Sequence, residues 1–264
     1  MEVRKLNEKD IERMKDITPD GWADITPYFQ FYLSHANCNT FLFLKEGKII
    51  GTGNINYSKN SAWLSHIIVL PQFRAKGFGS FITEYLMGET KKRNYPTVML
   101  LATPLGEPVY KKFGFKSVCK YVFLKSVPLT ISESKDIKSI SEEDVDQIFE
   151  MDKAITGEDR AYLMKDSMKG FLVRAEGKLR GFYLPNVWDG PVIATDIKAG
   201  MELLNLKLRQ NGLVVLPDKN KNALTLLLKN GATELHAPIT RMILGEDIPW
   251  APDKIFGRIA GAFG

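Results

Sequence analysis

One stretch of the chain restricts the fold most strongly, because it contains a strand, a glycine loop, a helix and a second strand in immediate succession. Residues 62–70 form an apolar run that ends at Pro71, and residues 98–102 form another. Between them, residues 77–93 carry apolar side chains at helical spacing. Strands that alternate with helices in this way predict an α/β fold with helices packed on a sheet.

The residues on either side of this stretch extend the predicted sheet. Two apolar runs separated by Glu46 and Gly47 indicate a hairpin, so the sheet begins antiparallel. A short helix that stops at Gly114 and a closing strand follow later. The predicted strands lie at 40–44, 48–57 and 117–125, and the short helices at 10–16 and 107–112. Gly51 and Gly53, in the hairpin, are assigned only a structural role.

The second half of the chain repeats part of the first. Residues 177–181, Gly-Lys-Leu-Arg-Gly, resemble residues 47–51, Gly-Lys-Ile-Ile-Gly, and a strand at 213–216 precedes a helix at 222–229. A chain of 264 residues accommodates two small domains. A change to Ser, Lys, Asp and Glu places a linker at about 126–135. We therefore expect domains at 1–126 and 136–264, the second a degenerate copy of the first.

Composition and charge exclude several classes of protein. With 44% hydrophobic and 25% charged residues, the chain is neither disordered nor fibrous. The net charge of +5 would attract an anionic partner, but the basic residues are dispersed, which argues against nucleic acid. Cys38 and Cys119 suggest neither a disulfide framework nor a metal site. No apolar run is long enough to cross a bilayer and no export signal is visible, so we expect a cytoplasmic protein.

The loop between the first strand and the helix has the composition of a phosphate site. Gly77 and Gly79 let the backbone turn tightly and approach a ligand, and the helix that follows presents unpaired N–H groups. Arg74 and Lys76 add positive charge. The loop is not a Walker motif, since no Gly-Lys-Ser/Thr closes it, and Ile82 stands where a dinucleotide fingerprint has its third glycine. The corresponding segment of the second half, 190–200, has no glycine pair before its helix at 201–210.

Two motifs in the right order resemble the GNAT superfamily of acyl-CoA N-acyltransferases. The first is Arg-Ala-Lys-Gly-Phe-Gly at 74–79, and the second is Val-Tyr-Lys-Lys-Phe-Gly-Phe at 109–115. The resemblance covers roughly residues 1–126 and implies acetyl-CoA as the co-substrate, without a metal. It also implies two tandem GNAT-like domains, each a mixed, largely antiparallel sheet flanked by helices. The cofactor-binding positions that it implies are Ile67, Ile68 and Val69 along the pantetheine arm, and Arg74, Ala75, Lys76, Gly77, Phe78, Gly79 and Ser80 at the pyrophosphate.

The resemblance also implies direct attack of an amine on the acyl carbonyl, which requires a base and a proton for the departing thiolate. Tyr110 matches the family's general-acid position; the alternative is a packing role. His66 is a candidate base, although strand alternation turns it away unless a bulge intervenes, and a chain of water molecules is the other candidate. His35 and Cys38 could line the acceptor pocket or be incidental.

Residues 152–160 and 241–245 resemble the companion domain of a group of bacterial acetyltransferases. Asp159, Arg160 and Arg241 could line a substrate cleft there, or form structural ion pairs. The expected function is transfer of an acetyl group to a primary amine of a small molecule or peptide, without nucleic acid or membrane partners. A homodimer is compatible with this expectation. The alternative is a non-catalytic acyl-CoA sensor or interaction module.

Overall fold

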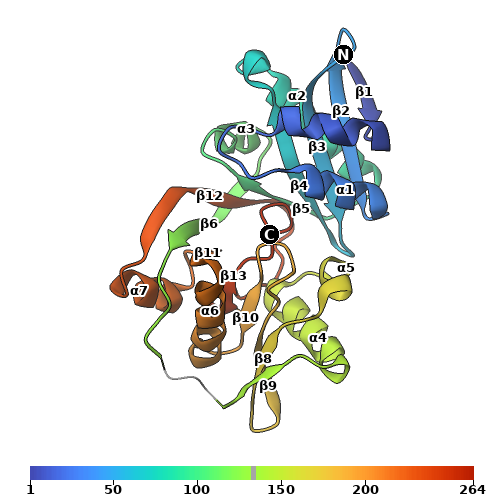
Figure 1. Cartoon of the computed structure of the whole chain (residues 1–264). Coiled ribbons are helices and arrows are strands. Elements are labelled where there is room, and N and C mark those ends of the chain that lie inside the picture. Colours follow the sequence, from blue (N-terminus) through green and yellow to red (C-terminus); the bar gives the residue numbers. More distant parts are fainter. Residues whose placement is uncertain (132–134) are drawn as a thin grey trace. The chain divides into compact units, whose positions relative to one another are not determined.

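The computed structural model describes residues 1–131 and 135–264, which form two compact units (Figure 1). Unit 1 comprises residues 1–116, 242–246 and 263, and unit 2 comprises residues 117–241, 247–262 and 264. Residues 117–125 group with unit 2 because the strand that contains them pairs with a later strand of that unit. The domains expected at 1–126 and 136–264 remain a prediction. Part of the expected linker, residues 132–134, lies outside the described residues.

Unit 1 is built on a sheet whose strands follow the order β1-β2-β3-β4-β5, with the end of β12 beside β5. The first four strands are antiparallel, and β5 runs parallel to β4. The strands are β1 (Glu2–Lys5), β2 (Cys38–Lys45), β3 (Lys48–Tyr57), β4 (Ser61–Val69), β5 (Thr97–Ala102) and β12 (Thr233–Gly245). The helices are η1 (Glu8–Ile17), α1 (Thr26–Ser34), η2 (Pro71–Phe73), α2 (Phe78–Lys92) and α3 (Glu107–Lys112).

Two glycines in β3 bring helix α2 close to the sheet. A Cβ atom at Gly51 would lie 2.9 Å from Cδ1 of Ile82, and one at Gly53 would lie 2.7 Å from Cδ1 of Leu86. Ile82 and Leu86 are fully buried on the face of α2 that covers the sheet. These contacts give a physical reason for the structural role assigned to Gly51 and Gly53, since a larger side chain at either position would clash with the helix.

Strand β4 is interrupted by a bulge at His66. Thr52 of β3 pairs with Ile68, whereas Asn54 pairs with Ser65, so His66 and Ile67 together oppose a single residue of β3. His66 has a φ of 46°, and its carbonyl oxygen accepts a hydrogen bond of 2.8 Å from the Thr52 hydroxyl. The regular alternation of side chains between the two faces of β4 therefore ends at Ser65. The face on which His66 lies cannot be predicted from that alternation.

Unit 2 contains an antiparallel sheet in the order β13-β10-β9-β8-β7, together with β6, which pairs antiparallel with β11 and lies beside β12. Its strands are β6 (Lys116–Lys125), β7 (Ile137–Ser139), β8 (Phe171–Ala175), β9 (Lys178–Tyr183), β10 (Val192–Ala194), β11 (Leu213–Pro217) and β13 (Ile255–Gly257). Its helices are η3 (Glu142–Asp144), α4 (Val145–Thr156), α5 (Ala161–Met164), η4 (Lys165–Ser167), α6 (Ile197–Asn211), α7 (Lys221–Lys229) and η5 (Pro252–Lys254). The predicted fold class, α/β with largely antiparallel sheets flanked by helices, is confirmed.

Helix α6 carries a buried lysine inside unit 2. Lys207 is 4% exposed, and its Nζ donates to the carbonyl oxygens of Asp189 and Gly190, the latter at 2.9 Å. Burial lowers the pKa of Lys207 from 10.5 to about 8. Between these two values the unfolded chain binds the proton more tightly than the folded chain, so Lys207 makes the protein more stable as the pH rises.

Replacing Lys207 with methionine removes this dependence. A pKa shift from 10.5 to about 8 corresponds to about 3 kcal/mol. We expect the free energy of unfolding of the native protein to rise by that amount, relative to Lys207→Met, between pH 8 and pH 10.5. Urea unfolding across this pH range measures it. Lys198→Met, at an exposed position of the same helix, is the control. A difference in free energy of unfolding between the native protein and Lys207→Met that does not change with pH would contradict the lowered pKa of Lys207.

Candidate functional site

The loop from β4 to α2 presents open backbone at the start of a helix. Ala75 and Gly77 have φ angles of 57° and 83°, and these two left-handed residues turn the chain into α2. Gly77 caps the helix, and in the described part of the chain no side chain bonds the first N–H groups, at Phe78, Gly79 and Ser80. A Cβ atom at Gly77 or Gly79 would meet nothing within 4 Å. The loop can therefore admit a ligand group against its backbone.

Positive charge lies on the same loop. Arg74 and Lys76 are exposed, and each is anchored by one hydrogen bond to a nearby backbone carbonyl. Arg74 Nε donates to the carbonyl of Val69 at 3.0 Å, and Lys76 Nζ donates to that of Gln72 at 2.9 Å. Two cations, a helix N-terminus and unobstructed glycines together favour a polyphosphate group. The residues fit the pyrophosphate that the sequence analysis assigned to them.

Beside the loop, the end of β4 extends past its pairing with β5. The parallel register runs from Ser61 opposite Thr97 to Leu64 opposite Leu100, whereas β4 continues to Val69. The backbone of Ile67, Ile68 and Val69 thus lies beyond the paired region on that side. An extended ligand with amide groups could pair there as a strand would.

Tyr110 lies on α3 and is packed tightly. Its side chain is 8% exposed, and its Cε2 would lie 2.9 Å from a Cβ atom at Gly106. The ring of Phe115 is 6.1 Å away, edge to face. Burial raises the pKa of Tyr110 well above 10. The phenol therefore keeps its proton at neutral pH and can donate a hydrogen bond, and its general-acid role stays a prediction.

A group of buried polar side chains bridges β2, β3 and β4. Asn54 Nδ2 donates to Asn56 Oδ1 at 2.8 Å and to Ser65 Oγ at 3.0 Å, and Asn56 Nδ2 donates to Ser65 Oγ at 3.0 Å. Thr40 Oγ1 donates to Asn54 Oδ1 at 2.7 Å. The hydroxyl of Tyr32, from α1, lies 3.3 Å from Ser65 Oγ. We call these five residues the polar cluster. All are less than 9% exposed, and polar groups buried together must satisfy one another.

His66 joins the polar cluster to a set of aromatic rings. Its Nδ1 is 2.8 Å from the Tyr32 hydroxyl. Its ring lies 5.0 Å from that of Tyr28, 5.3 Å from that of Phe29 and 6.4 Å from that of Trp22, between centroids. Burial lowers the pKa of His66 from 6.5 to about 4, so the imidazole is neutral at pH 7.

The two other residues considered for the acceptor pocket lie in different surroundings. Cys38 is buried against the polar cluster, with Sγ 3.3 Å from Asn56 Oδ1, and burial raises the pKa of its thiol to about 12. His35 stacks on Phe31 with 3.7 Å between ring centroids. Tyr32, Asn54 and Asn56 were not predicted as site residues, although two asparagines two positions apart in a buried strand were a signal that could have found them.

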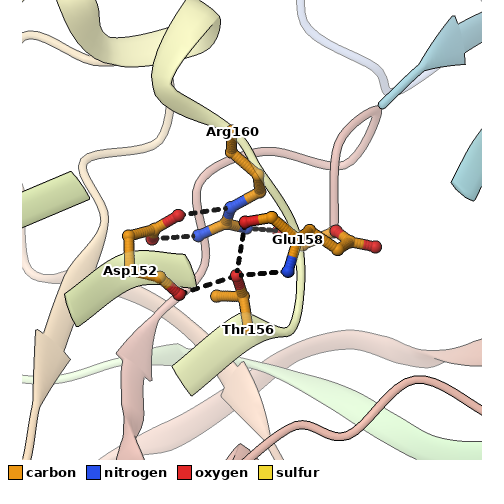
Figure 2. A network of polar contacts seen from close by, with 5 residues as sticks. Asp152, Thr156, Glu158 and Arg160 are labelled. Carbon is orange, nitrogen blue, oxygen red and sulfur yellow. Dashed lines mark hydrogen bonds and ion pairs between the residues drawn. The ribbon is translucent and has the colours of Figure 1, made fainter. Parts of the chain in front are cut away.

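In unit 2, four charged residues and Thr156 form a buried network; Figure 2 labels Asp152, Thr156, Glu158 and Arg160. Arg160 makes a bidentate ion pair with Asp152, at 3.0 and 2.6 Å, and its Nη1 donates to the carbonyl oxygen of Gly264 at 3.1 Å. Arg241 lies 3.8 Å from Glu158. The four charged side chains are at most 6% exposed, which favours the structural alternative for Arg160 and Arg241. Asp159, by contrast, is exposed.

Two kinds of feature are absent from the described residues. Within residues 1–131 and 135–264, no group of three or more His, Cys, Asp or Glu side chains is placed to hold a metal ion. The helices of the same residues include none with the length and apolar character needed to cross a membrane.

Comparison with known proteins gives consistent matches. Residues 16–127 match the family model described as Acetyltransferase (GNAT) domain. Over 190 residues the chain is 27% identical to holothin acyltransferase of Pseudoalteromonas sp. (strain SANK 73390), covering 72% of this chain. The matched region spans 55% of that relative's length.

Two solved structures share the fold over almost the whole chain. A putative acetyltransferase from Pyrococcus horikoshii superposes with a TM-score of 0.84 at 24% identity, covering 99% of this chain and 95% of that one. A tandem GNAT protein from the clavulanic acid biosynthesis pathway has a TM-score of 0.64 at 12% identity, covering 92% and 98%. These likenesses support the predicted tandem architecture.

Proposed function

The chain carries a GNAT acetyltransferase domain over residues 16–127, and from this premise we propose that the protein transfers an acetyl group from acetyl-CoA to a primary amine. The observation that carries the proposal is the open loop at the start of α2, where Gly77 and Gly79 leave room for a pyrophosphate. Arg74 and Lys76 would neutralise its charge, and the end of β4 would pair with the pantetheine arm.

The proposed chemistry is direct transfer. The amine nitrogen forms a bond to the acyl carbon, the carbon–sulfur bond breaks, and the sulfur leaves with the bonding electrons. The nitrogen loses a proton to solvent water, and Tyr110 stabilises the departing sulfur by a hydrogen bond. The main contribution of the protein is to hold the two reactants in contact in the orientation that the transfer requires. No covalent intermediate and no metal are needed.

The acceptor is proposed as a primary amine on a small molecule or peptide. The relative described as a holothin acyltransferase supports a small-molecule acceptor. We place the reaction in the cytoplasm, without nucleic acid or membrane partners, and a homodimer is compatible with it. The degenerate second copy carries no equivalent of the glycine loop between residues 190 and 200, so we assign acetyl-CoA to the first copy.

The test is release of CoA thiol from acetyl-CoA in the presence of a panel of small amines and peptides, followed by mass spectrometry of the products. Amine-dependent release with a product heavier by one acetyl group would support the transferase. Binding of acetyl-CoA without release from any acceptor would support the sensor alternative.

Tyr110→Phe tests the proposed hydrogen bond from Tyr110 to the departing sulfur. Loss of a hydrogen bond to a charged group costs about 1.5–3 kcal/mol, so turnover should fall about 10- to 100-fold. The affinity for acetyl-CoA should stay within about twofold, since a bond made only in the transition state does not affect ground-state binding. Steady-state kinetics and calorimetry separate the two effects. Unchanged turnover would return Tyr110 to a packing role.

A further inference from the structure

The donor and the acceptor of each contact in the polar cluster can be assigned from its hydrogen bonds. Ser65 Oγ accepts one bond from Asn54 Nδ2 and one from Asn56 Nδ2, each at 3.0 Å. A hydroxyl has two acceptor sites and one hydrogen, so both acceptor sites are occupied. The hydrogen of Ser65 is left for the oxygen of Tyr32, at 3.3 Å. Tyr32 is therefore the acceptor in this contact.

The same assignment of donors and acceptors extends from Tyr32 to His66. Burial raises the pKa of Tyr32 well above 10, so the phenol keeps its hydrogen. With its oxygen accepting from Ser65, that hydrogen points to Nδ1 of His66, at 2.8 Å. Nδ1 is thus an acceptor. Because a neutral imidazole carries one hydrogen, that hydrogen must be on Nε2.

The other ring nitrogen, Nε2, lies among aromatic rings, and the backbone that carries the imidazole is held in place. His66 is partly exposed, and in the described part of the chain no group is bonded to its Nε2. The bulge fixes the backbone, since the Thr52 hydroxyl holds the His66 carbonyl at 2.8 Å. The rings of Trp22, Tyr28 and Phe29 surround the imidazole and bring no formal charge.

We propose that His66 presents a fixed Nε2–H donor to an uncharged oxygen, such as a carbonyl or amide oxygen, on the acyl acceptor. Ser65 and Tyr32 are positioning residues that set its tautomer. A nitrogen that already carries a proton cannot remove one, so this role replaces the base hypothesis for His66. The aromatic rings favour an acceptor in which the amine and the oxygen lie on a flat, uncharged body. What the inference says about the acceptor rests on the proposed function. What it says about the tautomer of His66 does not.

The tautomer can be measured without any ligand. Nitrogen-15 NMR of histidine-labelled protein between pH 6 and pH 8 distinguishes a protonated Nε2 from a protonated Nδ1, and His66→Gln identifies the signals of His66 among the three histidines. We expect the Nε2–H form alone in the native protein, and a shift toward the Nδ1–H form in Tyr32→Phe. Tyr28→Phe is the control, since it alters a ring beside the imidazole and leaves Tyr32 in place. An Nδ1–H form in the native protein, or no change in folded Tyr32→Phe, would overturn the proposal.

A second measurement compares His66→Gln with His66→Glu, using an amine from the panel that the native protein acetylates. Both residues meet the same strain at a φ of 46°, but only glutamine retains an N–H donor, whereas glutamate offers a base. We expect turnover of the glutamine variant to exceed that of the glutamate variant by about tenfold or more. The opposite order would support a base and overturn the proposal. If the native protein acetylates nothing, the proposed function fails while the NMR result still decides the tautomer.

Discussion

Arg160→Met is expected to lower the free energy of unfolding by about 3–5 kcal/mol. The substitution leaves the carboxylate of Asp152 without its cation at a position that is 1% exposed. It also removes the donor to the Gly264 carbonyl, at 3.1 Å. A buried charge without a partner costs more than the original pair contributed, which makes this the largest stability effect that we expect. Urea unfolding followed by circular dichroism measures it.

Two further variants separate the charge from the packing. Arg180, whose side chain is 34% exposed, pairs at 3.6 Å with the exposed Glu176, so Arg180→Met should cost less than about 1 kcal/mol. The double variant Asp152→Leu with Arg160→Met removes both charges and should recover part of the lost stability. An Arg160→Met variant as stable as Arg180→Met would contradict the assignment of a buried pair.

Gly79→Val is expected to weaken binding of acetyl-CoA by about 100-fold or more, which corresponds to about 2.8 kcal/mol. The new side chain meets no protein atom within 4 Å of its Cβ position, so it would occupy the space that the proposed pyrophosphate needs. The fold should be retained. Calorimetric titration with acetyl-CoA measures the affinity, and a thermal melt tests the fold.

Gly88→Val is the matched control. Gly88 lies in the same helix as Gly79, and a Cβ atom there also meets nothing within 4 Å, so Gly88→Val adds the same side chain to α2 without a steric clash. Gly77→Val is less informative, because its φ of 83° would strain any side chain. Equal affinities for Gly79→Val, Gly88→Val and the native protein would reject the loop as the pyrophosphate site.

The elements predicted best from the sequence were those defined by local pattern. Strand β3 at Lys48–Tyr57 and helix α3 at Glu107–Lys112 have the predicted bounds. Helix α1 was not predicted, because its sequence Thr-Pro-Tyr-Phe-Gln-Phe-Tyr-Leu-Ser has apolar side chains on all faces and therefore no helical period. Strand β12 was not predicted either, and it contributes residues to both units.

The candidate site also contains one part that a local sequence pattern predicts and another that it does not. The loop 74–79 was found from the sequence because its glycines and cations are adjacent in the chain. The polar cluster joins Tyr32, Asn54 and Ser65, up to 33 positions apart, and depends on contacts that no local pattern encodes. The bulge at His66 arises from pairing with β3, so its positive φ could not be predicted from residues 61–69 alone.

The most direct test of the central claim is calorimetric titration of the native protein with acetyl-CoA. We predict saturable binding with one site per chain, competition by CoA, and an affinity about 100-fold weaker or more in Gly79→Val but unchanged in Gly88→Val. Absence of binding by the folded native protein would contradict the assignment of the loop from Arg74 to Gly79, and with it the proposed acetyltransferase.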